Sequence, residues 1–363
     1  MKNIKILSFL VGLAALFAAC ENNDNEGPVT PEPREQVGRT VLVYIVGDAG
    51  DSNELSDLFK INFSDMKAGM EEVDYSKCNL VVYSEMKNDL PHLISLKQKN
   101  GKVVADTLFT YAEQNPLDKE VMSKVIAQTV DYFPADSYGF VFLSHSSSWV
   151  SASNNANSRS IGYYRKTQMN IPDFREALFS AFPKPLKFIL FDSCNMQSVE
   201  VAYELRDCAE YFIGSPTEIP GPGAPYKAVV PEMFTETNLA MNIAEAYYGY
   251  YEKLYTGVSP ISNENWTGGI ATSVIKSDAL DNLAAATKTI IPKYIQDKRE
   301  VNRSGLLAYD FNDDANYDFD ELIQYKQLGY QAAVFSFDRP PLNMLKHKHM
   351  RVIYTTNEKI KLL

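Results

Sequence analysis

After a polar N-terminal region, short runs of β-branched and aromatic residues alternate with stretches in which apolar residues recur at helical spacing. The clearest apolar runs are Thr40–Val46, Asn79–Glu85, Tyr138–His145 and Leu186–Asp192. Strands that alternate with helices build βαβ units, which cover both faces of a mainly parallel sheet with helices. The chain is therefore predicted to have an α/β fold, with a mixed C-terminal portion, residues 277–363, packed on it.

The remaining elements can also be placed approximately. We expect strands at Gly101–Phe109 and Tyr211–Ser215, the first in a hairpin with residues 92–98 across an Asn100-Gly101 turn. We expect helices at Asn53–Met70, Lys119–Phe133, Pro172–Phe182, Ser198–Leu205, Asn242–Tyr255 and Asp278–Ile291, the last ended or kinked by Pro292.

The N-terminus, "MKNIKILSFLVGLAALFAAC", has the pattern of an export signal over residues 1–19. Lys2 and Lys5 precede an apolar stretch that is too short to span a bilayer as a mature helix. The ending "FAAC" resembles a bacterial lipobox, in which Cys20 would be lipidated; an ordinary signal peptide cleaved near Ala19 is the alternative. The lipobox predicts an outer-membrane lipoprotein of a Gram-negative bacterium.

The next segment, "ENNDNEGPVTPEPREQVG", is polar and contains three prolines. It cannot bury a core, so residues 20–38 are predicted to be a flexible tether before a folded domain at residues 39–363. Its acidic start resembles the surface-export signal of Bacteroidetes lipoproteins, which implies a place at the cell surface.

The formal charge of −11 and the pI near 5.0 argue against a nucleic-acid partner, because phosphate binding needs a basic surface. We expect a monomer. Beyond Cys20 the chain has Cys78, Cys194 and Cys208, an odd number, so an exported form should keep at least one free thiol. A helix between Cys194 and Cys208 argues against a bridge joining them.

Two apolar strands end in chemically reactive residues. "GFVFLSH" ends in His145, and "KFILFDSC" ends in Cys194. The carboxyl ends of parallel strands meet at one edge of a sheet, where open α/β sheets keep their sites. A thiolate is the nucleophilic form of cysteine, and an imidazole beside it can take and return its proton. The pair therefore predicts a Cys-His catalytic dyad; the alternative is a hydrogen-bonded core histidine and a cysteine that only fills the core.

Several blocks resemble the clostripain family of cysteine peptidases, within the caspase-like clan. They are "VLVYIVGDAGDSNEL", "FVFLSHSSSW", "DSCNMQSVEVAYEL" and "TGGIATSVIKSDALDNLAAA". The likeness implies a caspase-like α/β/α sandwich, a dyad of His145 and Cys194, cleavage after a basic residue, and often activation by internal proteolysis. His145 also precedes Cys194 by about 50 residues, the spacing of caspases.

Under this reading the site residues have distinct roles. His145 would protonate the leaving amine, and the backbone N–H groups of Cys194 and Ser146 would hold the oxyanion. Asp192 would meet an Arg or Lys side chain of a peptide or protein substrate, unless it caps the turn before the next helix. Glu218 is a second candidate for the substrate pocket.

The chain also departs from the family pattern. His145-Ser146-Ser147-Ser148-Trp149 replaces the usual His-Gly-x-Gly-Trp, and "GPGA" at 221–224 lacks the second carboxylate of some relatives. If the position after the histidine needs a positive φ, serine would distort the oxyanion hole. The alternative function is therefore a catalytically inactive surface lipoprotein that binds peptides or a protein partner.

Two further segments bear on activation and cofactors. "SASNNANSRSIGYYRKTQ" is expected to be an exposed loop whose Arg159, Arg165 or Lys166 would suit self-cleavage. The acidic stretch at residues 310–320 invites a calcium reading, but it lacks the glycine and bidentate glutamate of an EF-hand loop. We expect a solvated loop there, no metal site and no cofactor.

Overall fold

The computed structural model describes residues 32–50, 54–147, 160–256, 269–296, 353–354 and 361–362. The strands are β1 Val37–Val46, β2 Cys78–Glu85, β3 His92–Lys99, β4 Lys102–Thr110, β5 Ala135–Leu143, β6 Ser160–Tyr164, β7 Thr167–Asn170, β8 Phe188–Asp192, β9 Tyr211–Gly214, β10 Ser273–Lys276, β11 Ile353–Tyr354 and β12 Lys361–Leu362.

One sheet runs in the order β12-β11-β10-β9-β8-β5-β1-β2-β3-β4, and β6 and β7 form a separate hairpin. The central strands β9, β8, β5, β1 and β2 are parallel to one another. Antiparallel pairing appears on both sides, where β3 joins β2 and β10 joins β9. The predicted α/β fold with a mainly parallel sheet is confirmed.

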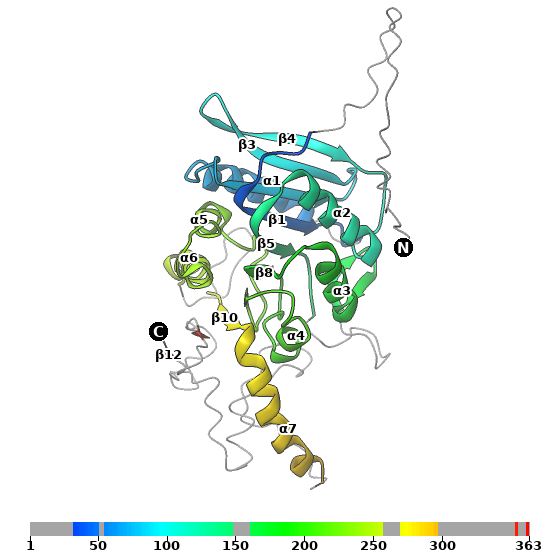
Figure 1. Cartoon of the computed structure of the whole chain (residues 1–363), viewed down its shortest axis with the longest axis vertical. Helices are drawn as coiled ribbons and strands as arrows, with labels where there is room; N and C mark the ends of the chain where they lie inside the picture. Colours follow the sequence, from blue (N-terminus) through cyan, green and yellow to red (C-terminus); the bar gives the residue numbers. More distant parts are fainter. Residues whose placement is uncertain are drawn as a thin grey trace, which may run out of the picture. The chain divides into compact units, whose positions relative to one another are not determined.

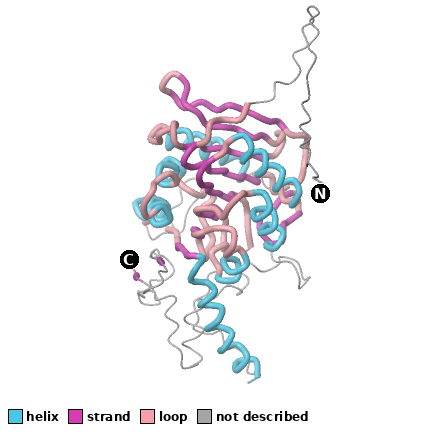
Figure 2. The backbone as a smooth tube through the Cα atoms, in the orientation of Figure 1, coloured by secondary structure: helices cyan, strands magenta, loops and turns pink. Residues whose placement is uncertain are grey.

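Helices cover both faces of this sheet (Figures 1 and 2). Along β1, Leu42 and Tyr44 pack with α2, α3 and α4, while Val41 and Val43 pack with α1, α5 and α6 on the opposite face. Burial on both faces explains why the central strands are continuously apolar. The helices are α1 Glu54–Met70, α2 Lys119–Tyr132, α3 Ile171–Ala181, α4 Val199–Glu204, α5 Tyr226–Glu232, α6 Leu239–Leu254 and α7 Leu280–Gln296.

The expected strands and helices are present within a few residues of their predicted bounds, with some exceptions. The pattern missed α5 and β10, and it assigned the β6–β7 hairpin to an exposed loop. Pro292 does not end α7, which continues to Gln296. A proline inside a helix removes one hydrogen bond, and here this loss does not stop the helix.

The predicted turn between β3 and β4 is confirmed. The two strands pair antiparallel, and both turn residues have positive φ, 53° at Asn100 and 76° at Gly101. This is the backbone that a two-residue hairpin turn requires, and Asn-Gly adopts it at little cost.

The predicted tether ends earlier than residue 38. The Arg34 guanidinium lies 4.9 Å from the centre of the Phe133 ring and donates to Asn79 Oδ1 at 3.3 Å, and β1 begins at Val37. The prediction failed here because it considered apolar residues alone, whereas Arg34 is held by an aromatic ring and an amide.

The predicted signal peptide and Cys20 lie outside the described residues. Within the described ranges, no helix is both long enough and apolar enough to cross a membrane. Cys78, Cys194 and Cys208 are all free thiols, which agrees with the expectation of at least one.

Candidate active site

The pairing of β5 with β8 sets the geometry of the candidate site. Leu143, the last residue of β5, lies opposite Asp192, the last residue of β8. His145 follows the first of these by two residues, and Cys194 follows the second by two. The structure therefore brings His145 and Cys194 to the same carboxyl edge on neighbouring parallel strands, as the sequence pattern predicted.

Cys194 lies in a tight turn between β8 and α4. The residue after it, Asn195, has a φ of 59°, and its N–H donates to Thr217 O at 2.9 Å. The N–H of Ile219 donates to Cys194 Sγ at 3.4 Å. The turn is thereby tied to the segment that follows β9, and α4 starts after it with Ser198 as its N-cap.

The surroundings of Cys194 favour the neutral thiol. Burial raises the pKa of Cys194 to about 11, and the negative charges of Glu218 and Asp192 add to this effect, while the hydrogen bond from Ile219 opposes it. At neutral pH the thiol therefore keeps its proton in the free protein. A nucleophilic Cys194 would need a proton acceptor beside it.

His145 and Ser146 follow β5 and are half-buried. Ser146 is not among the described residues with positive φ, so a serine fits its backbone without strain. Within the described part of the chain, neither the N–H of Ser146 nor that of Cys194 donates a hydrogen bond to another residue. The Ser146 N–H can therefore donate to a new acceptor such as a developing oxyanion, and the Cys194 N–H, which lies near its own Sγ, can do the same.

Asp192 is buried, with 2% of its surface exposed, and it is enclosed by hydrogen-bond donors. Its Oδ1 accepts from the Ala224 N–H at 2.8 Å and from Tyr247 Oη at 3.1 Å, and its Oδ2 accepts from Tyr226 Oη at 2.8 Å. Burial raises the pKa of Asp192 to about 6, and these hydrogen bonds limit the rise. The carboxyl is therefore mostly ionised at neutral pH.

This arrangement bears on the two roles expected for Asp192. It does not cap the following helix, because Ser198 does so. Gly223 packs directly on its carboxylate, since a Cβ on Gly223 would lie only 2.5 Å from Oδ2. Asp192 is a buried carboxylate two residues before Cys194. Glu218, which precedes Ile219 in the chain, is exposed.

No pattern in the sequence indicated that Tyr226 and Tyr247 would hold Asp192. Both are fully buried, Tyr226 on α5 as the single tyrosine of that helix and Tyr247 on α6, where tyrosines are frequent. Their spacing from Asp192 follows from how α5 and α6 pack on the sheet. Only the three-dimensional structure could identify them.

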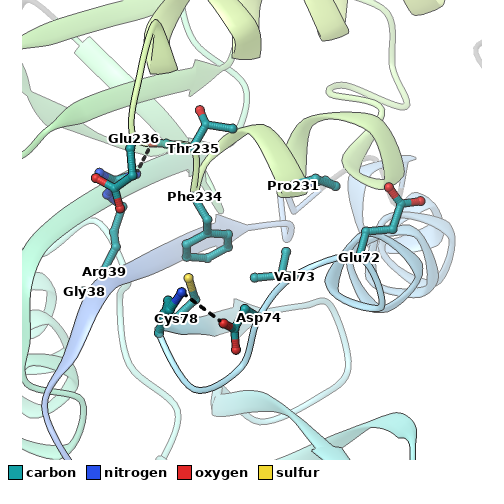
Figure 3. A pocket seen from close by; sticks show the side chains of 11 residues that line it. Gly38, Arg39, Glu72, Val73, Asp74, Cys78, Pro231, Phe234, Thr235 and Glu236 are labelled. Atoms are coloured by element: carbon teal, nitrogen blue, oxygen red, sulfur yellow. Dashed lines mark hydrogen bonds and ion pairs between the residues drawn. The ribbon is translucent and has the colours of Figure 1, made fainter.

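A cavity of about 330 Å³ lies at the amino edge of the sheet, beside the first residues of β1 and β2. Figure 3 shows the side chains that line it. It is lined by Arg39 at the start of β1, Cys78 at the start of β2, and Phe234 after α5. The Arg39 guanidinium donates to Met233 O and Thr235 O, each at 3.0 Å, and so links β1 to the segment that follows α5.

Among the described residues, no group of three or more His, Cys, Asp or Glu side chains is arranged to hold a metal ion. The acidic stretch at residues 310–320 lies outside them. The described site contains a thiol, an imidazole, backbone N–H groups and two nearby carboxylates.

The chain is similar to known proteins in sequence and in fold. The family model described as the clostripain family matches residues 43–338. No curated protein matches the chain.

Several solved structures are similar to the chain. A secreted C11 cysteine protease from Bacteroides thetaiotaomicron, in complex with an irreversible peptide inhibitor, is 44% identical with a TM-score of 0.70, over 80% of this chain and 78% of that one. An inactive zymogen C11 protease from Parabacteroides distasonis is 29% identical with a TM-score of 0.67, over 91% of this chain and 89% of that one. A second secreted C11 protease from Bacteroides thetaiotaomicron, 22% identical with a TM-score of 0.66 over 80% of each chain, shares the fold.

Proposed function

This chain belongs to the clostripain family of cysteine peptidases, and on that premise we propose that it is an exported endopeptidase that cleaves after Arg or Lys through a Cys194-His145 dyad. The observation that carries the proposal is the register of β5 and β8, which puts both residues at one sheet edge. Export is supported by the signal pattern at residues 1–19 and by a relative described as secreted.

In the proposed reaction, His145 takes the thiol proton of Cys194 as the thiolate attacks the carbonyl carbon of the scissile bond. The N–H groups of Ser146 and Cys194 stabilise the oxyanion. The imidazolium then gives its proton to the leaving amine, which leaves an acyl-enzyme. Water, deprotonated by His145, releases the new carboxyl terminus and restores the thiol.

The charge around Cys194 supports a basic substrate. Glu218 and Asp192 both act on its thiol as negative charges. A cationic side chain bound beside Cys194 would be attracted by both carboxylates. Two opposite unit charges about 8 Å apart, at an effective dielectric constant of about 20, interact by about 2 kcal/mol, or roughly 30-fold in rate.

Cleavage of fluorogenic peptides that differ only in the residue before the scissile bond tests the proposal on the purified full chain. Cys194→Ala should abolish turnover and His145→Ala should leave a trace, because the two act as one unit. Cys208→Ala is the matched control, since this other buried thiol lies outside the site. Cleavage that survives Cys194→Ala would refute the dyad.

Specificity is tested by Asp192→Asn, which should lower kcat/KM for an Arg peptide about 30-fold more than for a Gln peptide. An equal loss on both substrates would refute the charge argument and leave the dyad standing. The alternative is a chain that binds peptides without cleaving them, and the solved inactive zymogen motivates it. Peptide binding without Cys194-dependent turnover, even after limited trypsin treatment, would support that alternative.

A further inference from the structure

The β6–β7 hairpin has an unusual turn. Its two turn residues, Arg165 and Lys166, have φ values of 42° and 74°. A two-residue hairpin turn needs positive φ at both positions, but Asn and Gly are the residues that adopt it readily. Neither arginine nor lysine favours this backbone, so other contacts must hold the turn in place.

Those contacts come mainly from Arg165. Its Nε donates to Asp48 Oδ2 at 2.6 Å, and its backbone N–H donates to Asp48 O at 3.2 Å. The guanidinium also pairs with Glu113. Asp48 follows β1, its side chain is only 3% exposed, and its Oδ1 accepts from the Gly50 N–H at 2.9 Å. The tip of the hairpin is therefore fixed to the carboxyl end of β1.

The strand before this turn contacts the segment that carries His145. The N–H of Tyr163 donates to Ser144 Oγ at 3.1 Å, and the N–H of Gly162 donates to Ser146 Oγ at 3.4 Å. These two serines are the immediate neighbours of His145 in the chain. Gly162 has a φ of 73°, and a Cβ there would lie 2.5 Å from Leu117 Cδ2, so β6 packs closely against the domain.

We propose that Arg165 and Asp48 are positioning residues for His145, an inference that rests on the proposed function. Their ion pair holds the hairpin, and the hairpin holds the serine on each side of the imidazole. Ser146, which replaces the family's glycine after the histidine, has a structural role in this arrangement, because its hydroxyl accepts the hydrogen bond from the Gly162 N–H. Arg165, which is also a predicted site of self-cleavage, forms part of this support.

Kinetics of the full chain, normalised to the number of reactive Cys194 thiols, test the proposal. Arg165→Gln and Asp48→Asn should each lower kcat about 10- to 100-fold with KM changed less than about 2-fold, because misplacement by about 1 Å is enough for such a loss. The double variant should be no slower than either single variant, since all three lose the same ion pair. Arg165→Lys should recover part of the rate, because it keeps the charge without the planar fork.

Lys166→Gln is the matched control, since it changes the other residue of the same turn, whose side chain makes no ion pair with any described residue. All variants are compared after limited trypsin treatment, so that a lost site of self-cleavage does not affect the rates. Its kcat should equal that of the unmodified chain. Loss of thermal stability in Arg165→Gln and Asp48→Asn without loss of kcat per reactive thiol would overturn the proposal, and so would an equal loss in Lys166→Gln. Asp48→Asn is nearly isosteric, so it serves if Arg165→Gln fails to fold.

A second readout needs no turnover. The ring signals of the four histidines can be followed by NMR, with that of His145 identified by its absence from His145→Ala. Asp48→Asn should move or broaden the His145 signal and leave that of His92 unchanged. If the unmodified chain cleaves no peptide, the proposed function fails, but the His145 signal still tests whether the ion pair positions this residue. If the His145 signal is unchanged in Asp48→Asn, the positioning inference fails and the proposed function stands.

Discussion

Replacing Asp192 by Asn should stabilise the folded protein at neutral pH. The carboxyl is 2% exposed, and burial raises its pKa to about 6 from an ordinary value of 3.8. This difference in pKa lowers the free energy of unfolding by about 3 kcal/mol when the carboxyl is ionised, since one pKa unit corresponds to about 1.4 kcal/mol. Asparagine carries no charge, so it avoids this cost, and its oxygen can keep the bonds from Ala224 and Tyr247.

The pH dependence has a definite sign. The folded protein binds the Asp192 proton more tightly than the unfolded chain, so its stability falls as the pH rises from 3.8 to about 6. Below this window the carboxyl is neutral in both states and costs nothing; above it the full cost is present. The advantage of Asp192→Asn should therefore grow by about 2 to 3 kcal/mol between pH 4 and pH 7 and then stay constant.

Urea unfolding at several pH values, in a Cys194→Ala background that prevents self-cleavage, measures this advantage. A constant offset from altered hydrogen bonds to the tyrosines would not affect the pH-dependent part. Asp131→Asn on α2 is the control, because that exposed carboxylate should give no such growth. The reasoning would be refuted by an advantage of Asp192→Asn that is the same at pH 4 and pH 7.

Three other outcomes can be measured directly. Gly223→Ala should lower the free energy of unfolding by about 2 to 4 kcal/mol, because φ is 69° there and a Cβ would clash with the Asp192 carboxylate. Gly101→Ala, which has open space around it, should lower it by about 1 kcal/mol, and equal losses in urea unfolding would contradict the clash. Cys20→Ser should move the protein from the membrane fraction to the soluble fraction, and unchanged partitioning would reject lipidation. Deleting residues 21–32 should leave the thermal midpoint unchanged, so a fall of several degrees would show that they pack on the domain.

The part of the site that lies at strand ends was predictable from the sequence. Continuous apolar runs mark strands buried on both faces, and parallel strands bring their carboxyl ends together. His145 and Cys194 each follow such a run, so their proximity needed no knowledge of the rest of the chain. The turn at Asn100-Gly101 was also predictable, because two adjacent residues determine its backbone conformation.

The contacts of Asp192 and Arg165 could not be predicted in this way. Tyr226 and Tyr247 reach Asp192 from helices on one face of the sheet, and Asp48 reaches Arg165 from the segment after β1. None of these pairs has a local pattern, because each depends on how separate elements pack. The Arg165-Lys166 turn was missed for a related reason: its residues disfavour the backbone that distant contacts impose.

The pairing of β5 with β8 has a consequence for how the protein could be divided. The two strands carry the reactive residues and are hydrogen-bonded directly to each other, although the chain between them runs from residue 144 to residue 187. A break between residues 147 and 160 would leave this pairing and both sheet halves in place. The molecule is thus suited to fragment complementation, in which two separately produced pieces, one bearing the imidazole and one bearing the thiol, reassemble into a working whole.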